Sequence, residues 1–225
     1  MNVLYRDSRL LAVYKPSGLP VHRGMDRSPV TLVDMVRDET GMPVAYPIHR
    51  LDRGTSGVVL FAMDAEAARV MQALLQGGGV RKTYLAIVRG VTPPEGLIDH
   101  PVPRRPGGER VDAVTRFKRL SSAVIEPREA SLVELEPVTG RFHQLRRHMK
   151  HINHPIIGDS NYGKSSLNIA FRELHGLARL ALHAVSLGFI HPFTGKRLEI
   201  VSALPADLSE PMKSMGLSVR SSSGP

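Results

Sequence analysis

Short apolar runs separated by turn-forming residues are the feature that most limits the folds open to this chain. Residues 3–18 indicate two short strands around an Asp-Ser turn, and residues 57–64 indicate a continuous apolar strand. Further strands are predicted over residues 82–90 and 129–140, and residues 179–202 indicate two strands joined by a turn. Strands that arrive in hairpins with few helices between them predict an α+β fold with a mixed, largely antiparallel central sheet flanked by helices.

Three segments between these strands have helical patterns. Residues 28–41 place a proline near the first turn and a glycine past the end, and residues 65–79 carry an apolar face before a glycine run. Residues 141–153 are the third predicted helix. Residues 92–112 are rich in Pro, Gly and Arg, which indicates an exposed loop or hairpin. We find no internal repeat and no clear linker. We therefore expect a single domain over residues 1–217 and a disordered tail over residues 218–225.

The composition limits the partners and the chemistry. The formal net charge is +9 and the isoelectric point is 10.2, a balance typical of nucleic-acid-binding proteins. The absence of cysteine excludes a disulfide framework, a cysteine zinc site and a thiol nucleophile, and it fits a reducing compartment. Because we find neither a signal peptide nor a membrane-length apolar segment, we expect a cytoplasmic protein without membrane contact.

The predicted helix over residues 141–153 is strongly basic, with four Arg and Lys residues and no acid. Its predicted buried stripe consists of Phe142, Leu145, Met149 and Ile152. On a helical wheel Arg146 lies about 40° from Phe142, at the edge of the apolar face. Burying an arginine there costs free energy unless a carboxylate pairs with it. Asp52 is a candidate partner, and a generic surface salt bridge is the alternative. Arg147 and Lys150 point away from the stripe, toward RNA or solvent.

Two further patterns suggest other chemistry. The histidines at 143, 148 and 151 spread over about 140° of the helix surface, too widely to converge on one ion, so no metal site is expected. Residues 158–165, GDSNYGKS, match the phosphate-binding loop of nucleotide triphosphatases letter for letter. That loop works after a buried strand, whereas here the basic helix precedes it, and Asp159 would put a negative charge inside an anion cradle. A P-loop NTPase through Gly158–Ser165 is therefore kept only as an alternative from another class.

The segment HRLDRGTSG, residues 49–57, places Asp52 directly before a turn, and on its own it could be only a turn-forming residue. Four further blocks accompany it in the chain: KPSGLPVHR (15–23), KTYLAIVRG (82–90), TGRFHQLRRHMKHINHPIIGD (139–159) and LALHAVSLGFIHPFTG (180–195). Together, and in this order, they resemble the RluA family of pseudouridine synthases.

The resemblance implies isomerisation of uridine to pseudouridine within RNA, without a metal or another cofactor. Asp52 matches the catalytic aspartate of the family, and its cationic neighbours should keep it charged at neutral pH. Arg146 matches the arginine that pairs with this aspartate, and Tyr84 matches the tyrosine that stacks on the target base. Arg50 matches the arginine that fills the gap left by the flipped-out uridine. The candidate RNA-binding residues are Arg50, Arg53, Arg141, Arg147 and Lys150.

The resemblance also bears on which RNA is modified. Because the chain begins directly at the catalytic strands, the N-terminal RNA-binding domain of the S4 type carried by many family members is expected to be absent. The doubled arginine at 146–147 is similar to members that act on tRNA, so uridine 65 of tRNA is the expected target. A ribosomal-RNA synthase of the same family and a non-catalytic RNA-binding protein remain alternatives. No obligate protein partner is implied.

Overall fold

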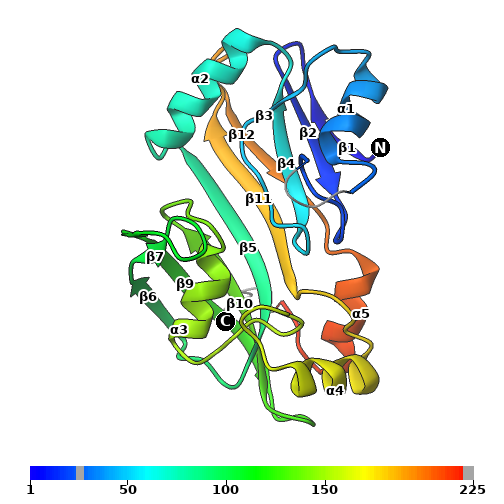
Figure 1. Ribbon diagram of the computed structural model, residues 1–225, viewed down its shortest axis with the longest axis vertical. Helices are drawn as coiled ribbons and strands as arrows, with labels where there is room; N and C mark the ends of the chain where they lie inside the picture. Colours follow the sequence, from blue (N-terminus) through cyan, green and yellow to red (C-terminus); the bar gives the residue numbers. More distant parts are fainter. Residues whose placement is uncertain (24–27, 220–225) are drawn as a thin grey trace, which may run out of the picture. The chain divides into compact units, whose positions relative to one another are not determined.

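The computed structural model describes residues 1–23 and 28–219. The chain divides into two compact units, each of which is described by itself (Figure 1). The first unit comprises residues 1–82 and 184–203, and the second comprises residues 83–183 and 204–225. The backbone passes from one unit to the other inside two strands, β5 (Val80–Arg89) and β11 (Leu182–Ile190), and again between residues 203 and 204.

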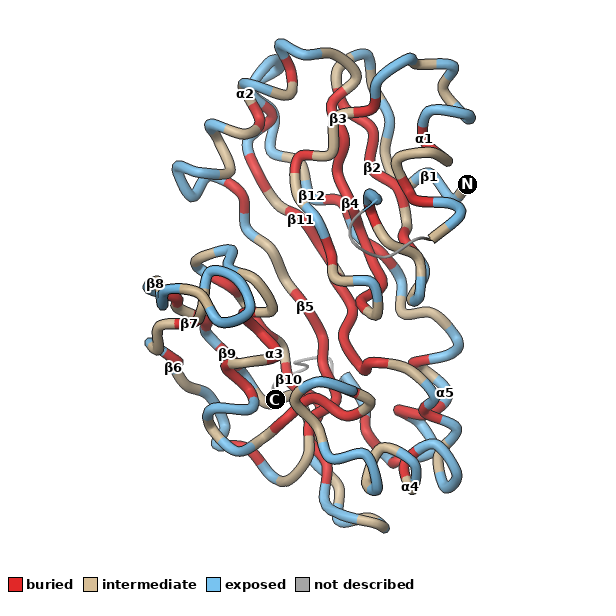
Figure 2. The backbone as a smooth tube through the Cα atoms, in the orientation of Figure 1, coloured by how far each residue is buried: buried red, intermediate tan, exposed pale blue. Residues whose placement is uncertain are grey.

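The first unit is built on strands that pair mostly antiparallel. Besides β11, they are β1 (Val3–Arg6), β2 (Leu10–Lys15), β3 (Tyr46–Pro47), β4 (Ser56–Ala62) and β12 (Arg197–Val201). The strand order is β1-β2-β4-β11, with β3 paired to β4 and β12 paired to β11. Strand β4 is buried along its whole length (Figure 2), as its continuous apolar sequence predicts for a strand covered on both faces.

The two helices of the first unit begin and end where their capping residues predict. Helix α1 (Leu32–Thr40) starts with a capping box between Thr31 and Asp34 and ends at Gly41, whose φ is 68°. Helix α2 (Ala65–Gln76) starts at Asp64, whose side chain accepts a hydrogen bond from a backbone N–H of the first turn. Helix α2 packs against β4. Both helices were predicted, but α1 begins only at Leu32, so the proline predicted near its first turn lies before the helix.

The second unit combines a four-stranded antiparallel arrangement with a small hairpin. Besides β5, its strands are β6 (Glu95–Asp99), β7 (Val102–Pro103), β8 (Arg110–Val111), β9 (Val114–Ala123) and β10 (Ala130–Pro137). The order is β5-β10-β9-β6, and β7 pairs only with β8. The region predicted as an exposed loop or hairpin therefore contains β6 and the β7–β8 hairpin.

Among the described residues of the second unit there are three helices: α3 (Gln144–His151), α4 (Ser165–His175) and α5 (Ala206–Ser214). Helix α3 packs on β10, and α4 packs on α5. The sequence analysis predicted α3 but neither α4 nor α5. Helix α4 follows Lys164, which is not a usual capping residue, and α5 contains Pro211, which ordinarily disfavours a helix interior.

The basic helix α3 begins later than predicted. His143 has a φ of 52°, in the left-handed region, and the helix starts only at Gln144. Phe142 therefore lies outside the helix, and the angle predicted between Phe142 and Arg146 does not apply. Leu145 and Met149 are buried as expected, whereas Phe142 and Ile152 are only partly buried.

The observed fold confirms the predicted α+β class with a largely antiparallel sheet and flanking helices. The single domain over residues 1–217 stays a prediction. So does the disordered tail: the backbone N–H of Ser218 donates to Ser121 Oγ at 3.1 Å, and residues 220–225 lie outside the described residues. In the part of the chain that the structure describes, no helix is long and apolar enough to cross a membrane.

Candidate active site

Asp52 lies in the loop between β3 and β4, residues 48–55, which we call the Asp52 loop. The backbone N–H of Thr55 donates to the carbonyl oxygen of Asp52 at 3.0 Å and closes a turn directly after it. Leu51 and Thr55 are buried on either side, while Asp52 itself is partly exposed. The loop therefore buries Leu51 and Thr55 in the first unit and leaves Asp52 partly exposed between them.

A buried lysine braces the Asp52 loop from the end of β2. Lys15 is 0% exposed, and its ammonium donates to the carbonyl oxygens of Pro16 (2.9 Å), Leu19 (2.6 Å) and Arg53 (3.1 Å). The backbone N–H of Gly18 donates to the same Arg53 carbonyl at 2.8 Å. A buried charge is tolerable only when hydrogen bonds replace its water, so Lys15 and these carbonyls fix the loop after β2 to the loop that carries Asp52.

The two arginines that flank Asp52 lie at the surface of the first unit. Both Arg50 and Arg53 are exposed. Arg53 Nε donates to the carbonyl oxygen of Gly18 at 2.9 Å, so this side chain also braces the loop. Arg50 Nη1 lies 3.3 Å from His22 Nε2. Their role in RNA binding stays a prediction.

His49 is held in its neutral form three residues before Asp52. Its Nε2 accepts a hydrogen bond from the backbone N–H of Leu60 at 3.2 Å, which requires the ring proton on Nδ1. Burial, together with the charge of Lys82, lowers the pKa of His49 to about 4. Burial also lowers the pKa of Lys82. His49 thus acts as an uncharged acceptor that links the Asp52 loop to β4.

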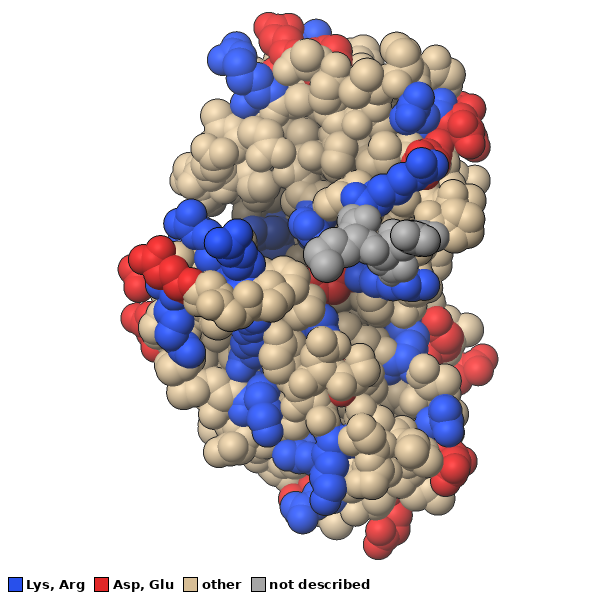
Figure 3. All heavy atoms as spheres, viewed as in Figure 1, with Lys and Arg blue, Asp and Glu red and all other residues tan. Residues whose placement is uncertain are grey.

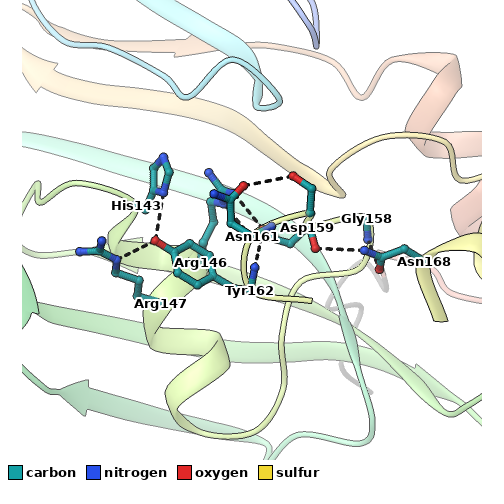
Figure 4. A network of polar contacts seen from close by, with 9 residues as sticks. His143, Arg146, Arg147, Gly158, Asp159, Asn161, Tyr162 and Asn168 are labelled. Atoms are coloured by element: carbon teal, nitrogen blue, oxygen red, sulfur yellow. Dashed lines mark hydrogen bonds and ion pairs between the residues drawn. The ribbon is translucent and has the colours of Figure 1, made fainter. Parts of the chain in front are cut away.

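In the second unit, Arg146 forms a two-pronged ion pair with Asp159 (Figure 4). Arg146 Nε donates to Oδ2 of Asp159 at 2.7 Å, and Nη2 donates to Oδ1 at 2.8 Å. Arg146 is 7% exposed and Asp159 is 1% exposed. Burial would raise the pKa of Asp159, but the hydrogen bonds and charge of Arg146 lower it below its usual value. The pair is therefore ionised and buried.

Asp159 also organises the turn formed by residues 158–163, which we call the Asp159 turn. Its Oδ1 accepts hydrogen bonds from the backbone N–H groups of Asn161 (2.9 Å) and Tyr162 (3.0 Å). In a phosphate-binding loop such N–H groups would face a phosphate, whereas here the loop's own carboxylate takes them. Ile156, just before the turn, makes only an isolated antiparallel bridge to Val88. The observed arrangement therefore argues against a phosphate site in this segment.

The same turn holds the second arginine of α3. Arg147 Nε donates to the hydroxyl oxygen of Tyr162 at 2.8 Å, and its Nη1 donates to the carbonyl oxygen of Pro103 at 2.7 Å. The guanidinium carbon atoms of Arg146 and Arg147 lie 5.2 and 5.7 Å from the centre of the Tyr162 ring, within range of cation–π attraction. Figure 4 shows His143 directed at the same hydroxyl, 3.1 Å from it.

The remaining candidate residues of the second unit lie on β5 and around α3. Tyr84 is 9% exposed on β5, opposite Leu135 of β10. Arg141 is exposed and donates through Nε to the carbonyl oxygen of Asp112 at 3.1 Å. Lys150 is exposed on α3. On the face drawn in Figure 3, basic side chains gather over this unit, as expected of a surface that attracts phosphates.

The histidines near α3 serve as hydrogen-bonding and stacking groups. His148 is 0% exposed, with Nδ1 at 2.9 Å from Thr115 Oγ1 and Nε2 at 2.9 Å from the carbonyl oxygen of His100. His100 stacks on His151 with ring centres 3.6 Å apart, so the two rings lie face to face and do not converge on one point. Among residues 1–23 and 28–219, no group of three or more His, Cys, Asp or Glu side chains is placed to hold a metal ion.

Comparisons with known proteins identify the family. A family model described as RNA pseudouridylate synthase matches residues 9–151. Relatives named tRNA pseudouridine synthase C include those of Haemophilus ducreyi, 42% identical over 91% of this chain and 91% of the relative, and Haemophilus influenzae, 38% identical over 96% and 98%. The solved structure of human RNA pseudouridylate synthase domain containing 4 is 28% identical, covers 96% of this chain and 94% of its own, and superposes with a TM-score of 0.78.

The chain belongs to the RNA pseudouridylate synthase family. The RluA-family resemblance is confirmed, and the chain is an RNA pseudouridine synthase, an isomerase. The structure shows Asp159 as a partner of Arg146, and the predicted pairing of Arg146 with Asp52 stays a prediction. Sequence analysis missed two supporting residues, Lys15 and Tyr162, and it treated Asp159 only as a misfit within a phosphate loop.

The Lys15 contacts generate a test of stability. Lys15→Met keeps the apolar stem but removes the donor of three carbonyl oxygens. Because each unsatisfied buried polar group costs about 1–3 kcal/mol, the free energy of unfolding should fall by about 3 kcal/mol or more. Urea denaturation measures the free energy of unfolding. The control is Lys196→Met, which changes an exposed lysine. Equal losses in the two variants would contradict the bracing role.

His49 generates a test of pH dependence. The folded-state pKa of His49 is about 4 and its ordinary value is 6.5, so between these values the unfolded chain binds a proton that the folded chain does not. Its contribution to stability is therefore complete above pH 6.5 and is lost as the pH falls toward 4. His49→Gln keeps an acceptor for Leu60 but cannot titrate. The melting temperature of this variant should fall less than that of the wild type between pH 7 and 5; parallel curves would contradict the assignment.

Proposed function

We propose that this synthase converts uridine 65 of tRNA to pseudouridine. The observation that carries the proposal is the similarity to several relatives named tRNA pseudouridine synthase C, at 37–42% identity over 89–96% of this chain. The doubled arginine at 146–147 supports the same branch of the family. A ribosomal-RNA target within the family is the second candidate. Mapping pseudouridines in tRNA and ribosomal RNA from cells with and without the protein distinguishes the two.

The proposed chemistry needs an ionised carboxylate, and Asp52 supplies it from a braced and accessible loop. The uracil is detached from the ribose at N1, turned, and rejoined through C5, with C5 losing a proton and N1 gaining one. Arg146 orients Asp52, and Tyr84 stacks on the base and assists in removing the proton from C5. The reaction is redox-neutral and adds no atoms, so the proposal requires no cofactor.

The basic residues then bind the RNA around the reacting uridine. Arg50 fills the gap that opens when the uridine flips out of its stack. Arg53, Arg141, Arg147 and Lys150 neutralise phosphates, and their contribution should weaken as salt increases. In this proposal the protein works in the cytoplasm without an obligate protein partner.

Substitution of Asp52 tests the catalytic assignment. Asp52→Asn should bind tRNA as the wild type does but form no pseudouridine, because an amide is neither charged nor nucleophilic. The measurement is pseudouridine formed in a tRNA transcript, in buffer that contains EDTA and no ATP. Asp38→Asn, at an exposed aspartate of α1, is the control and should be fully active. Turnover by folded Asp52→Asn, or a strict need for ATP and magnesium, would contradict the proposal.

Arg147 tests the assignment of RNA-binding residues. Arg147→Ala should weaken tRNA binding and reduce the slope of log affinity against log salt by about one, since one phosphate contact is lost. Saturating tRNA should largely restore the rate. Affinities measured between about 50 and 200 mM salt, a range over which phosphate contacts make affinity fall steeply, provide the slope. Arg69→Ala, at an exposed arginine of α2, is the control, and an unchanged slope in Arg147→Ala would contradict the role.

A further inference from the structure

We propose that Asp159 is the positioning residue of this enzyme: it fixes the direction of the Arg146 guanidinium and, through Arg146, that of Asp52. The inference rests on the proposed function, because it takes Arg146 to be the residue that orients the catalytic carboxylate. The inference assigns a role to residues 158–165, whose sequence matches a phosphate-binding loop. The proposed reaction otherwise gives this segment no role.

The geometry of the ion pair supports a positioning role. Asp159 binds the edge of the guanidinium formed by Nε and Nη2, at 2.7 and 2.8 Å. A guanidinium is planar and rigid, so two parallel hydrogen bonds on one edge set both the plane and the direction of the opposite edge. With a single hydrogen bond to the carboxylate, the guanidinium could still rotate about that hydrogen bond. The second hydrogen bond prevents this rotation.

The carboxylate that holds Arg146 is itself held. Its two oxygens accept four hydrogen bonds, two from Arg146 and two from the backbone N–H groups of Asn161 and Tyr162; three of them fall on Oδ1 and one on Oδ2. The turn cannot shift easily beneath it. Gly158 has a φ of 78°, and a Cβ there would lie 1.9 Å from the carbonyl oxygen of Arg179.

The start of α4 locks the other end of this turn. Asn168 accepts a hydrogen bond from the backbone N–H of Gly158 at 3.0 Å and donates to the carbonyl oxygen of Asp159 at 3.0 Å. Helix α4 thus supports the turn, the turn supports Asp159, and Asp159 supports Arg146. Catalytic groups need this kind of support because small displacements from the productive geometry reduce the rate steeply.

Stability alone is a weaker account of the pair. A buried ion pair often contributes little net stability, because desolvation offsets the attraction between the charges. Two apolar side chains in place of Arg146 and Asp159 would fill the same volume at less cost. The charged pair is explained if the reaction needs one edge of the Arg146 guanidinium fixed by Asp159 and the opposite edge directed at Asp52.

The test compares Asp159→Asn with the wild type in single-turnover assays at saturating tRNA. Asparagine keeps the shape but loses the charge and one acceptor, so the Arg146 guanidinium is no longer fixed. The rate constant for pseudouridine formation should fall on the order of 10²-fold, as expected when a reacting group is misplaced, while the Kd for tRNA stays within about twofold of wild type. Asp207→Asn, which breaks the Arg179–Asp207 pair of the same unit, is the matched control and should leave the rate unchanged.

A double-mutant cycle separates positioning from a general structural effect. If Asp159 acts through Arg146, adding Asp159→Asn to Arg146→Lys should lower the rate little beyond Arg146→Lys alone, because the interaction is already lost. Multiplicative losses would overturn the proposal. Asp159→Glu keeps the charge but moves the carboxylate by one methylene group, and it decides the matter if Asp159→Asn does not fold: a reduced rate with unchanged Kd supports positioning, and a wild-type rate overturns it.

The outcomes also separate this inference from the proposed function. If the wild type forms no pseudouridine in tRNA or ribosomal RNA, the proposed reaction fails and the positioning role fails with it. If the wild type is active and Asp52→Asn is inactive, but Asp159→Asn turns over at the wild-type rate, the inference alone is wrong.

Discussion

The ion pair between Arg146 and Asp159 is the interaction on which the arrangement around the basic helix depends. It places a positive charge inside a packed unit, which is possible only because a carboxylate lies within 2.8 Å and itself accepts two backbone hydrogen bonds. Helix α3, the Asp159 turn and the start of α4 are linked through it. Removing either partner would leave the other buried and uncompensated, a larger loss than the net value of the pair.

In the first unit a buried charge is stabilised by backbone groups of the opposite kind. There the ion is a cation, Lys15, and backbone carbonyl oxygens surround it; in the second unit the ion is an anion, Asp159, and backbone N–H groups complete its shell. In both cases a charged side chain gathers the backbone of an irregular loop, which otherwise has few partners for its polar groups. The two loops concerned carry, or lie next to, the residues of the proposed reaction.

Much of this organisation could be read from the sequence, because it depends on local patterns. Strand β4 is a continuous apolar run, and Gly41 marks the end of α1. Motif resemblance identified the family and selected Asp52. Other features depend on contacts between distant residues: the burial of Lys15 requires the carbonyl of Arg53, 38 positions away. Arg146 was predicted at the edge of an apolar face and is buried, although the helical wheel behind that prediction assumed a start before His143, where the backbone turns left-handed.

The path of the chain through β5 and β11 has a consequence for how the protein can be divided. Each unit is assembled from two separate stretches of sequence, so no single cut yields a fragment that consists of one complete unit and nothing else. A truncation after β5 would remove the strands β11 and β12 from the first unit and leave the edge of β4 without its neighbour. Neither unit can therefore be produced as one continuous stretch of the chain, unlike domains that follow one another in sequence.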